Sequence, residues 1–266
     1  MKLTEELNKE YENVKETETD TIKGITDNSA VQEIYKSFTI MQKRRMNESI
    51  PTSYESCRQI IALNVGEFYS NDITQFCLLV YANDQEIKNL KDFGLFCSAL
   101  INAHYEHTKQ TGEYHLVLPI TDKKLPYIGI YNAGSEILIT GDCGNYLGSE
   151  MQSGKISVTG SVGERAGHML KGGKIIIMKD VGIETGLFMK NGNLQIFGNA
   201  KRGLGYHMIG GRIDVEGTLE DKFISIDGGE IYHRGKRIFR NTNNSEEELD
   251  TSSLFTIIKN FLRGRK

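Results

Sequence analysis

Several features that mark other classes of protein are missing from this chain of 266 residues. It has no tryptophan and no C-x-x-C pair, and Cys57, Cys77, Cys97 and Cys143 stand singly. Isolated cysteines argue against a zinc site, an iron–sulfur cluster or a disulfide framework. No apolar run reaches about 18 residues, and the charged N-terminus lacks the apolar core of a secretory signal. We therefore expect a soluble, cytoplasmic protein.

The balance of charged residues argues against a nucleic-acid-binding protein. The chain carries 32 Lys and Arg against 35 Asp and Glu, a formal net charge of −3, and the two signs are mixed. Non-specific nucleic-acid binding depends on an excess of positive charge, so we expect no nucleic-acid partner. No convergent set of acid, base, nucleophile and metal ligand is evident in the sequence, so we also expect no catalytic residues and no cofactor.

Glycine is abundant, and it marks a repeat. Most of the 28 glycines follow position 128, and from about Asn132 to Tyr232 the chain repeats at a constant spacing of 19 residues. Two columns of glycine recur once per repeat: Gly148, Gly167, Gly186 and Gly205 in the first, and Gly154, Gly173, Gly192 and Gly211 in the second. We assign these glycines a structural role, at sharp turns with positive φ or at close approaches between adjacent coils.

Apolar residues recur with the same period. Two apolar columns are Ile137, Ile156, Ile175, Leu194 and Ile213, and Ile139, Val158, Ile177, Ile196 and Val215. The column between them, Leu138, Ser157, Ile176, Gln195 and Asp214, becomes polar along the chain. This alternation is typical of a strand with one buried face, and stacked coils can bury what one coil cannot. We predict a mainly β fold, with a right-handed parallel β-helix over 128–238 whose last coil is one residue short.

The first half of the chain has a different composition. Residues 1–50 form a charged extension, in which Val31, Ile34, Tyr35 and Phe38 have the spacing of a short docking helix. Over 53–125 we predict a small α/β domain with strands at 57–65, 73–82 and 113–120, because these runs are rich in branched and aromatic residues. Its helix would begin at an Asp84 N-cap, end near Gln110 and bury Leu90, Phe93, Leu95, Phe96, Leu100 and Ile101.

The C-terminal tail separates from the repeats. Residues 241–253 form a polar linker, and 254–266 have the pattern of an amphipathic helix with Lys259, Arg263, Arg265 and Lys266 beside its apolar face. Such a helix can lie on a membrane surface. An open end of a β-helix needs a cover, however, so for residues 253–266 we favour capping or docking to a partner over membrane binding.

The repeats resemble a known family. The segments GSEMQSGKISV, GHMLKGGKIII, GLFMKNGNLQI and GYHMIGGRIDV share the phrase G-x-x-M-x-x-G-x-I-x-V, with Leu170 at the Met position of the second segment and Leu194 at the Ile position of the third. This phrase is similar to the GXGXG repeat of the C-terminal domain of the glutamate synthase large subunit. The same repeat occurs in one of the subunits of formylmethanofuran dehydrogenase and in the small subunit of a methylamine–glutamate methyltransferase. The resemblance covers about residues 132–232.

This resemblance implies a scaffold domain that packs between catalytic modules. The chain begins Met1-Lys2-Leu3, so the N-terminal cysteine nucleophile of glutamine hydrolysis is not expected, and the scattered cysteines do not match the cluster motif of glutamate synthase. We therefore expect a non-catalytic scaffold or subunit of a larger complex, with protein partners or self-association. The alternative hypothesis is an enzyme or small-ligand-binding protein that uses a groove between the α/β domain and the first coils.

A few residues are candidates for chemistry. His104 and His107 lie three apart on the predicted helix and could share a metal, but no third ligand is evident, so we favour a solvent-facing or locally bonded pair. His168 and His207 belong to different columns, which predicts that they lie on different sides of the coil. Cys143 shares a column with Val162, Val181, Ala200 and Leu219, which predicts a buried filler.

Basic residues recur on successive coils. Arg165, Lys171, Lys201 and Arg202 could form a basic strip. Glu150, Glu164 and Glu184 interleave with them, so we expect a mixed, solvated face.

Overall fold

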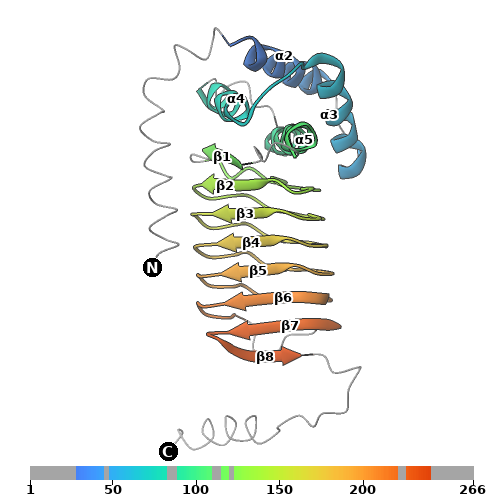
Figure 1. Ribbon diagram of the computed structural model, residues 1–266. Helices are drawn as coiled ribbons and strands as arrows, with labels where there is room; N and C mark the ends of the chain where they lie inside the picture. The colour runs from blue at the N-terminus through green and yellow to red at the C-terminus, as the bar shows by residue number, and fades with distance from the viewer. Residues whose placement is uncertain are drawn as a thin grey trace, which may run out of the picture.

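The computed structural model describes residues 28–44, 48–82, 89–109, 115–119, 123–220 and 226–240. In Figure 1 the helices lie together at one end of a stack of strands, and the strands run side by side along the rod. The predicted linker at 241–253, the predicted C-terminal helix at 254–266 and residues 1–27 of the predicted extension lie outside these ranges.

Helices form a cap at one end of the rod. They are α2 (Ser29–Lys43), α3 (Ile50–Asn64), α4 (Ser70–Ala82) and α5 (Leu90–Thr108). Side chains satisfy the first free N–H groups of three of them: Asn28 Oδ1 accepts from Ala30, Ser49 Oγ from Thr52, and Asn89 Oδ1 from Lys91. The helix predicted from Val31, Ile34, Tyr35 and Phe38 is thereby confirmed as α2.

A cluster of phenylalanines forms the core of the cap. Phe38 of α2 lies 5.6 Å from Phe76 of α4, 5.3 Å from Phe93 of α5 and 5.4 Å from Phe96 of α5, between ring centroids. None of the four rings is more than 2 % exposed. Since α2, α4 and α5 all contribute to one shared cluster, the cap depends on contacts between residues that are distant in the sequence.

The prediction of an α/β domain at 53–125 is wrong, because the strands predicted at 57–65 and 73–82 are the helices α3 and α4. Buried Ile73, Phe76, Cys77 and Val80 follow the spacing i, i+3, i+4, i+7 along one face of α4. The β-branched and aromatic content favoured a strand, but burial against the neighbouring helices decides the structure in favour of that helical period.

The predicted long helix exists as α5, with different limits. It is capped by Asn89, whereas Asp84 and the predicted end near Gln110 lie outside the described residues. Phe93, Leu95, Phe96, Leu100 and Ile101 are buried as expected, but Leu90 is 36 % exposed. Leu90 is the first residue of the helix, where the chain has not yet reached the core.

The strands form one sheet in sequence order, which confirms a parallel β-helix. They are β1 (His115–Pro119), β2 (Glu136–Thr140), β3 (Lys155–Val158), β4 (Lys174–Ile177), β5 (Asn193–Ile196), β6 (Ile209–Val215), β7 (Gly228–His233) and β8 (Lys236–Arg240). From β2 to β6 each residue pairs with the residue 19 positions later, as in Glu136 with Lys155. The strand predicted at 113–120 is therefore β1, which opens the β-helix rather than belonging to a separate domain.

Every glycine of the two repeat columns has positive φ, between 61° and 88°. A Cβ on Gly148 would lie 2.5 Å from Ile175 Cδ1 inside the helix, and a Cβ on Gly154 would lie 2.4 Å from the carbonyl oxygen of Ser135 on the preceding coil. The first column therefore makes room for the apolar interior, and the second lets neighbouring coils approach closely.

The pairing of β6 with β7 contains a β-bulge, because the last coil is one residue shorter than the others. Ile209 pairs with Gly228 at a spacing of 19, whereas Arg212 pairs with Glu230 at a spacing of 18. The short final coil expected from the sequence is thus confirmed. β8 then pairs antiparallel with β7 and forms the last strand of the sheet.

Helix α5 docks the cap directly onto the first coil, through Gly94, Ser98 and Asn102, which lie on one face at i, i+4 and i+8. A Cβ on Gly94 would lie 1.8 Å from the carbonyl oxygen of Pro126, so backbone meets backbone there. Ser98 Oγ donates to the Tyr127 carbonyl at 2.8 Å and accepts from the Gly129 N–H at 2.9 Å. Asn102 Nδ2 donates to the Tyr54 hydroxyl at 2.6 Å, which ties α3 to the same junction.

Candidate functional site

A row of rings in contact, some stacked and some edge to face, runs along one corner of the β-helix, and we call it the aromatic ladder. Its members are Tyr127, Tyr146, His168, Phe188, His207 and Tyr206. Tyr127 and Tyr146 stack at 4.9 Å with their planes 5° apart, and Phe188 and His207 stack at 5.5 Å and 7°. His168 joins the two stacks, at 5.8 Å from Tyr146 and 6.3 Å from Phe188.

The backbone beneath the ladder is in the left-handed region at every second residue. In one coil Tyr146, Gly148 and Glu150 have φ of 62°, 61° and 54°, and the pattern repeats coil by coil. The central position faces the interior and is glycine each time. The flanking positions carry side chains in nine cases: Tyr127, Tyr131, Tyr146, Glu150, Arg165, Met169, Glu184, Phe188 and His207.

Those nine side chains carry a conformational cost. A residue with a Cβ is less stable than glycine in this region by about 1–2 kcal/mol. Gly203 occupies the same column as Tyr146, Arg165 and Glu184, so glycine is compatible with this position of the coil. Non-glycine residues in the left-handed region cluster at functional sites, and here the chain retains them along one corner.

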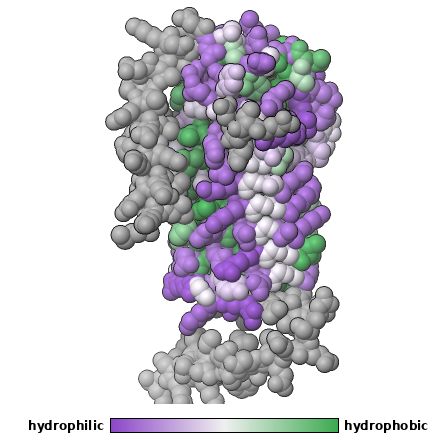
Figure 2. All heavy atoms as spheres, in the orientation of Figure 1, coloured by the Kyte–Doolittle hydropathy of each residue, from purple (hydrophilic) through white to green (hydrophobic). Residues whose placement is uncertain are grey.

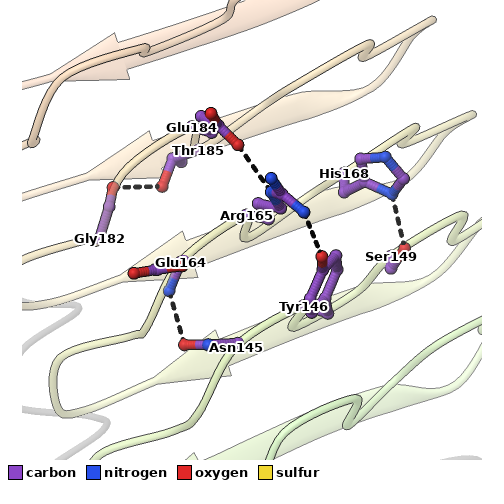
Figure 3. Close-up of polar contacts among 9 residues, drawn as sticks. All are labelled: Asn145, Tyr146, Ser149, Glu164, Arg165, His168, Gly182, Glu184 and Thr185. Carbon is purple, nitrogen blue, oxygen red and sulfur yellow. Dashed lines mark hydrogen bonds and ion pairs between the residues drawn. The ribbon is translucent and has the colours of Figure 1, made fainter.

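Charged groups accompany the ladder, and they pair with each other. Arg165 Nε donates to Glu184 Oε2 at 2.6 Å, and Arg165 Nη1 donates to the Tyr146 hydroxyl, which links three successive coils (Figure 3). Lys171 Nζ lies 3.0 Å from Glu150 Oε2. The predicted mixed face is confirmed for these two basic residues, while Lys201 and Arg202 follow on a later coil.

The ladder is most exposed toward the last coils. Phe188 is 41 % exposed and Tyr206 is 43 % exposed, and Ile209 follows with 59 %. These three residues form what we call the apolar end of the ladder. Large apolar side chains exposed close together on one surface are typical of an interaction site.

The prediction that His168 and His207 lie on different sides of the coil is wrong. Both rings belong to the ladder and contact Phe188 from its two sides, at 6.3 Å and 5.5 Å. The two residues do sit in neighbouring columns, but at this turn the side chains of neighbouring columns converge on one row. The ladder as a whole was not foreseen from the sequence.

The histidines on α5 do not face one another. His104 is 3 % exposed and packs 6.2 Å from Phe68, whereas His107 is exposed. Within the described ranges no group of three or more His, Cys, Asp or Glu residues could hold a metal ion. No described helix is both long and apolar enough to cross a membrane.

The four cysteines are buried and carry no disulfide. Cys143 bridges to Val162 on the next coil, its Sγ donates to the Leu125 carbonyl, and burial raises its pKa to about 12. Cys143 is therefore a buried filler, as predicted, rather than a nucleophile. In the cap, Cys77 and Cys97 have their sulfur atoms 3.8 Å apart.

A serine–histidine pair within the ladder invites a catalytic interpretation. Ser149 Oγ lies 3.2 Å from His168 Nδ1 (Figure 3), and burial, together with nearby Arg165, lowers the pKa of His168 below its usual value. The imidazole is therefore neutral near pH 7 and available as a base. Ser149 is only 4 % exposed, however, so a substrate has little access to its hydroxyl. The pair orients the His168 ring within the stack.

The cap and the first coil are packed against each other by α5, and a cleft lies elsewhere on the cap. This cleft measures about 740 Å³ and lies between the C-terminal halves of α3 and α5, with Arg58, Phe68, Glu106 and His107 among its walls. It is not the groove of the alternative hypothesis, which was predicted between the α/β domain and the first coils.

Fold and site together define a class of protein: a short parallel β-helix with a helical cap on its first coil and a row of aromatic and charged side chains along one corner. Comparison of the chain with models of known families, with curated proteins and with solved structures gives no match. The resemblance to GXGXG repeats stays a prediction that rests on the repeated phrase in the sequence.

Proposed function

We propose that this protein is a non-catalytic scaffold that binds a protein partner along the aromatic ladder. The observation that carries the proposal is the retention of nine side chains at left-handed positions, most of them aromatic or charged, along one corner. Stacking between neighbouring rings offsets part of that strain, at about 0.5–1.5 kcal/mol per pair. Stacking alone does not require the exposure of Phe188 and Tyr206, whereas partner binding does.

The composition of the ladder fits a protein partner. Tyr, Phe and Arg are enriched at the centres of protein interfaces, where a few such residues carry most of the binding free energy. From Tyr127 to His207 the ladder crosses four coil spacings, which is about 19 Å. That length suits the central part of an interface of ordinary size.

The GXGXG resemblance narrows the kind of partner. In the families that carry the repeat, it belongs to large enzyme complexes, so we propose that the partner is an enzyme module of a glutamate-synthase-like or related oxidoreductase or amidotransferase complex. The described residues of this chain support a structural role in such a complex, since its charged groups near the ladder pair with each other.

The cap cleft supports a second candidate, the binding of a small ligand. Its volume of about 740 Å³ is within the usual range for ligand sites, and Arg58 and Glu106 bring both charge signs to a wall that also contains apolar residues such as Ile61 and Phe68. A thermal-shift screen of the purified protein with nucleotides, flavins and acidic metabolites tests this candidate. A rise in the melting temperature that Arg58→Ala abolishes would support it.

The scaffold proposal is tested by photo-crosslinking through the apolar end of the ladder. A benzophenone amino acid at position 188 of the full chain, expressed in the native cells, should capture one defined protein in high yield. The double variant Phe188→Ala/Tyr206→Ala should lower co-purification of that protein by at least about tenfold, because truncating two exposed aromatic residues that bind the partner should cost more than about 1.4 kcal/mol.

Leu63→Ala is the matched control, since Leu63 is 83 % exposed but lies on α3 of the cap. It should leave co-purification unchanged. A wild-type protein that purifies alone as a monomer, or a double variant that retains the partner fully, would contradict the proposal. A crosslink to a second copy of the chain would identify self-association as the scaffold function.

A further inference from the structure

The outer face of the β-helix sheet is apolar over its first strands and polar over its last. On this face Val117, Leu138, Ser157 and Ile176 are followed by Gln195 and Asp214 in the same column. The neighbouring column begins with Thr140 and Thr159, continues with Met178 and Phe197, and ends with Glu216. In Figure 2 hydrophobic atoms gather along the edge of the rod at which the strand arrows of Figure 1 end.

The apolar part of this outer face is shielded from water. Leu138 is 7 % exposed, Ser157 is 4 % and Ile176 is 2 %, although all three point away from the interior of the coil. The Asp214 side chain, in the same column, is 24 % exposed. The helices α2 to α5 lie at the β1 end of the rod (Figure 1), so they do not reach Ile176 on β4. The described helices therefore do not account for the low exposure of this face.

A small hollow on the same face contains a buried polar group. It measures about 110 Å³, and its lining includes Val117, Leu138 and Ser157 together with the oppositely charged Glu136 and Lys155. Ser157 Oγ is buried and has no hydrogen-bond partner. Water would satisfy a hydroxyl on an open sheet face, so this buried hydroxyl fits a face that another segment closes over.

Two lysines on this face indicate which charge a segment docked there should carry. Lys155 and Lys174 lie on the outer face beside the apolar column, and neither forms an ion pair with another described residue. Cations that have no ion-pair partner among the described residues, at the border of an apolar surface, favour an acidic amphipathic occupant, whose apolar face would lie on Leu138 and Ile176.

We propose that residues 1–27 of this chain are that occupant. In this segment Leu3, Leu7, Tyr11 and Val14 share the spacing of one helix face, and eight acidic residues outnumber four basic ones. A helix from Leu3 to Val14 would be about 16 Å long. The strands β2 to β5 span about 14 Å, so the two lengths match. The segment is too polar to fold alone, and the sheet face supplies the apolar surface that it lacks.

The C-terminal segment is the other long stretch outside the described residues. Its apolar stripe at 254–262 is accompanied by four basic residues, which Lys155 and Lys174 would repel. Charge therefore selects the N-terminal segment. A second copy of the chain, or residues 254–266, are the alternative outcomes of the test.

Carbodiimide crosslinking of the full chain tests the proposal, because this reagent joins a lysine amine to a carboxylate only where the two touch. At high dilution, mass spectrometry should find Lys155 or Lys174 joined to glutamates within residues 1–27. Lys155→Arg/Lys174→Arg keeps the charge but removes the reactive amines, so this variant should lose the crosslinks. Mixing isotope-labelled and unlabelled protein separates crosslinks within a chain from those between copies.

A second arm disrupts the proposed contact. Leu7→Glu/Tyr11→Glu in the full chain should lower the crosslink yield by at least about tenfold and raise the fluorescence of an apolar dye, because two buried apolar side chains lose their contacts. Lys9→Glu, on the opposite side of the same helical pattern, should leave both readouts unchanged. Crosslinks from Lys174 to Glu246, Glu247 or Glu248, which precede residues 254–266, crosslinks to a second copy, or no crosslink at all, would overturn the proposal.

Discussion

The helical cap and the β-helix both bury apolar side chains, but they do so through different kinds of contact. In the cap, Phe38, Phe76, Phe93 and Phe96 from three helices share one cluster, so each ring contacts partners far away in the sequence. In the β-helix, an inward residue such as Ile213 pairs with its counterparts Leu194 and Ile231 on the adjacent coils. The cap is therefore one cooperative unit, whereas the rod is a series of nearest-neighbour contacts.

The largest expected effect separates these two kinds of core. Phe76→Ala should lower the free energy of unfolding by about 3–5 kcal/mol, because it leaves a cavity in the cluster that α2, α4 and α5 share. Since these helices depend on the same cluster, the whole cap should open. Ile213→Ala should cost about 2–5 kcal/mol but increase amide exchange mainly in β5, β6 and β7. Urea denaturation gives the energies, and hydrogen exchange gives the extent. Exchange that rises throughout the rod in Ile213→Ala would contradict the nearest-neighbour description.

The junction between the two regions should be the next most sensitive point. A Cβ at position 94 would lie 1.8 Å from the Pro126 carbonyl oxygen, so Gly94→Ala forces α5 away from the first coil. We expect a loss of about 3 kcal/mol in urea denaturation. Gly66→Ala is the control, because its Cβ would meet nothing closer than 3.5 Å. Equal stability of the two variants would mean that the cap and rod are not tightly docked.

Within the rod, the cost of replacing a glycine should depend on its surroundings. Gly186 has φ of 75°, and a Cβ there would lie 2.7 Å from Ile213 Cδ1, whereas Gly235 has φ of 73° with nothing within 4 Å. Gly235→Ala should cost about 1 kcal/mol from its backbone alone. Gly186→Ala adds overpacking and should cost about 3 kcal/mol in thermal or urea unfolding. Equal costs would show that the interior can make room for a methyl group.

The smallest expected effect concerns pH. Burial and the charge of Arg165 lower the pKa of His168 below 6.5, so the folded chain favours the neutral ring. Its contribution to stability should be complete above pH 6.5 and should fall as the pH drops from there toward the lower folded pKa. NMR titration should find the His168 midpoint below 6.5, and Arg165→Gln should move it upward. A midpoint at or above 6.5 would show that the ring is better solvated than its place in the stack indicates.

The same contrast explains what the sequence could predict. The β-helix was predictable because each column, such as Ile156 and Ile175, repeats one environment at a fixed spacing. The cap offered no repetition, and short apolar runs at 57–65 and 73–82 were compatible with either a strand or a buried helix. The period of Ile73, Phe76, Cys77 and Val80 did carry the helical pattern, but propensity pointed the other way.

The aromatic ladder escaped prediction for a geometric reason. Tyr146, His168 and Phe188 come from three different columns, so the row they form cannot be seen in any single column of the repeat. Only the alternating left-handed backbone at the turn brings neighbouring columns onto one row, and φ cannot be inferred for a Tyr or Phe from its type. A search for aromatic residues at spacings of 19 to 22, rather than 19 alone, would have found the row.

The constant register of the strands has a consequence for the length of the molecule. Because β2 to β6 repeat in steps of 19 residues, the rod can change length only in whole coils of about 4.8 Å. Deleting or duplicating one coil would leave both ends intact and alter only the distance between them. The number of coils therefore sets the distance between the cap and β8 in discrete steps.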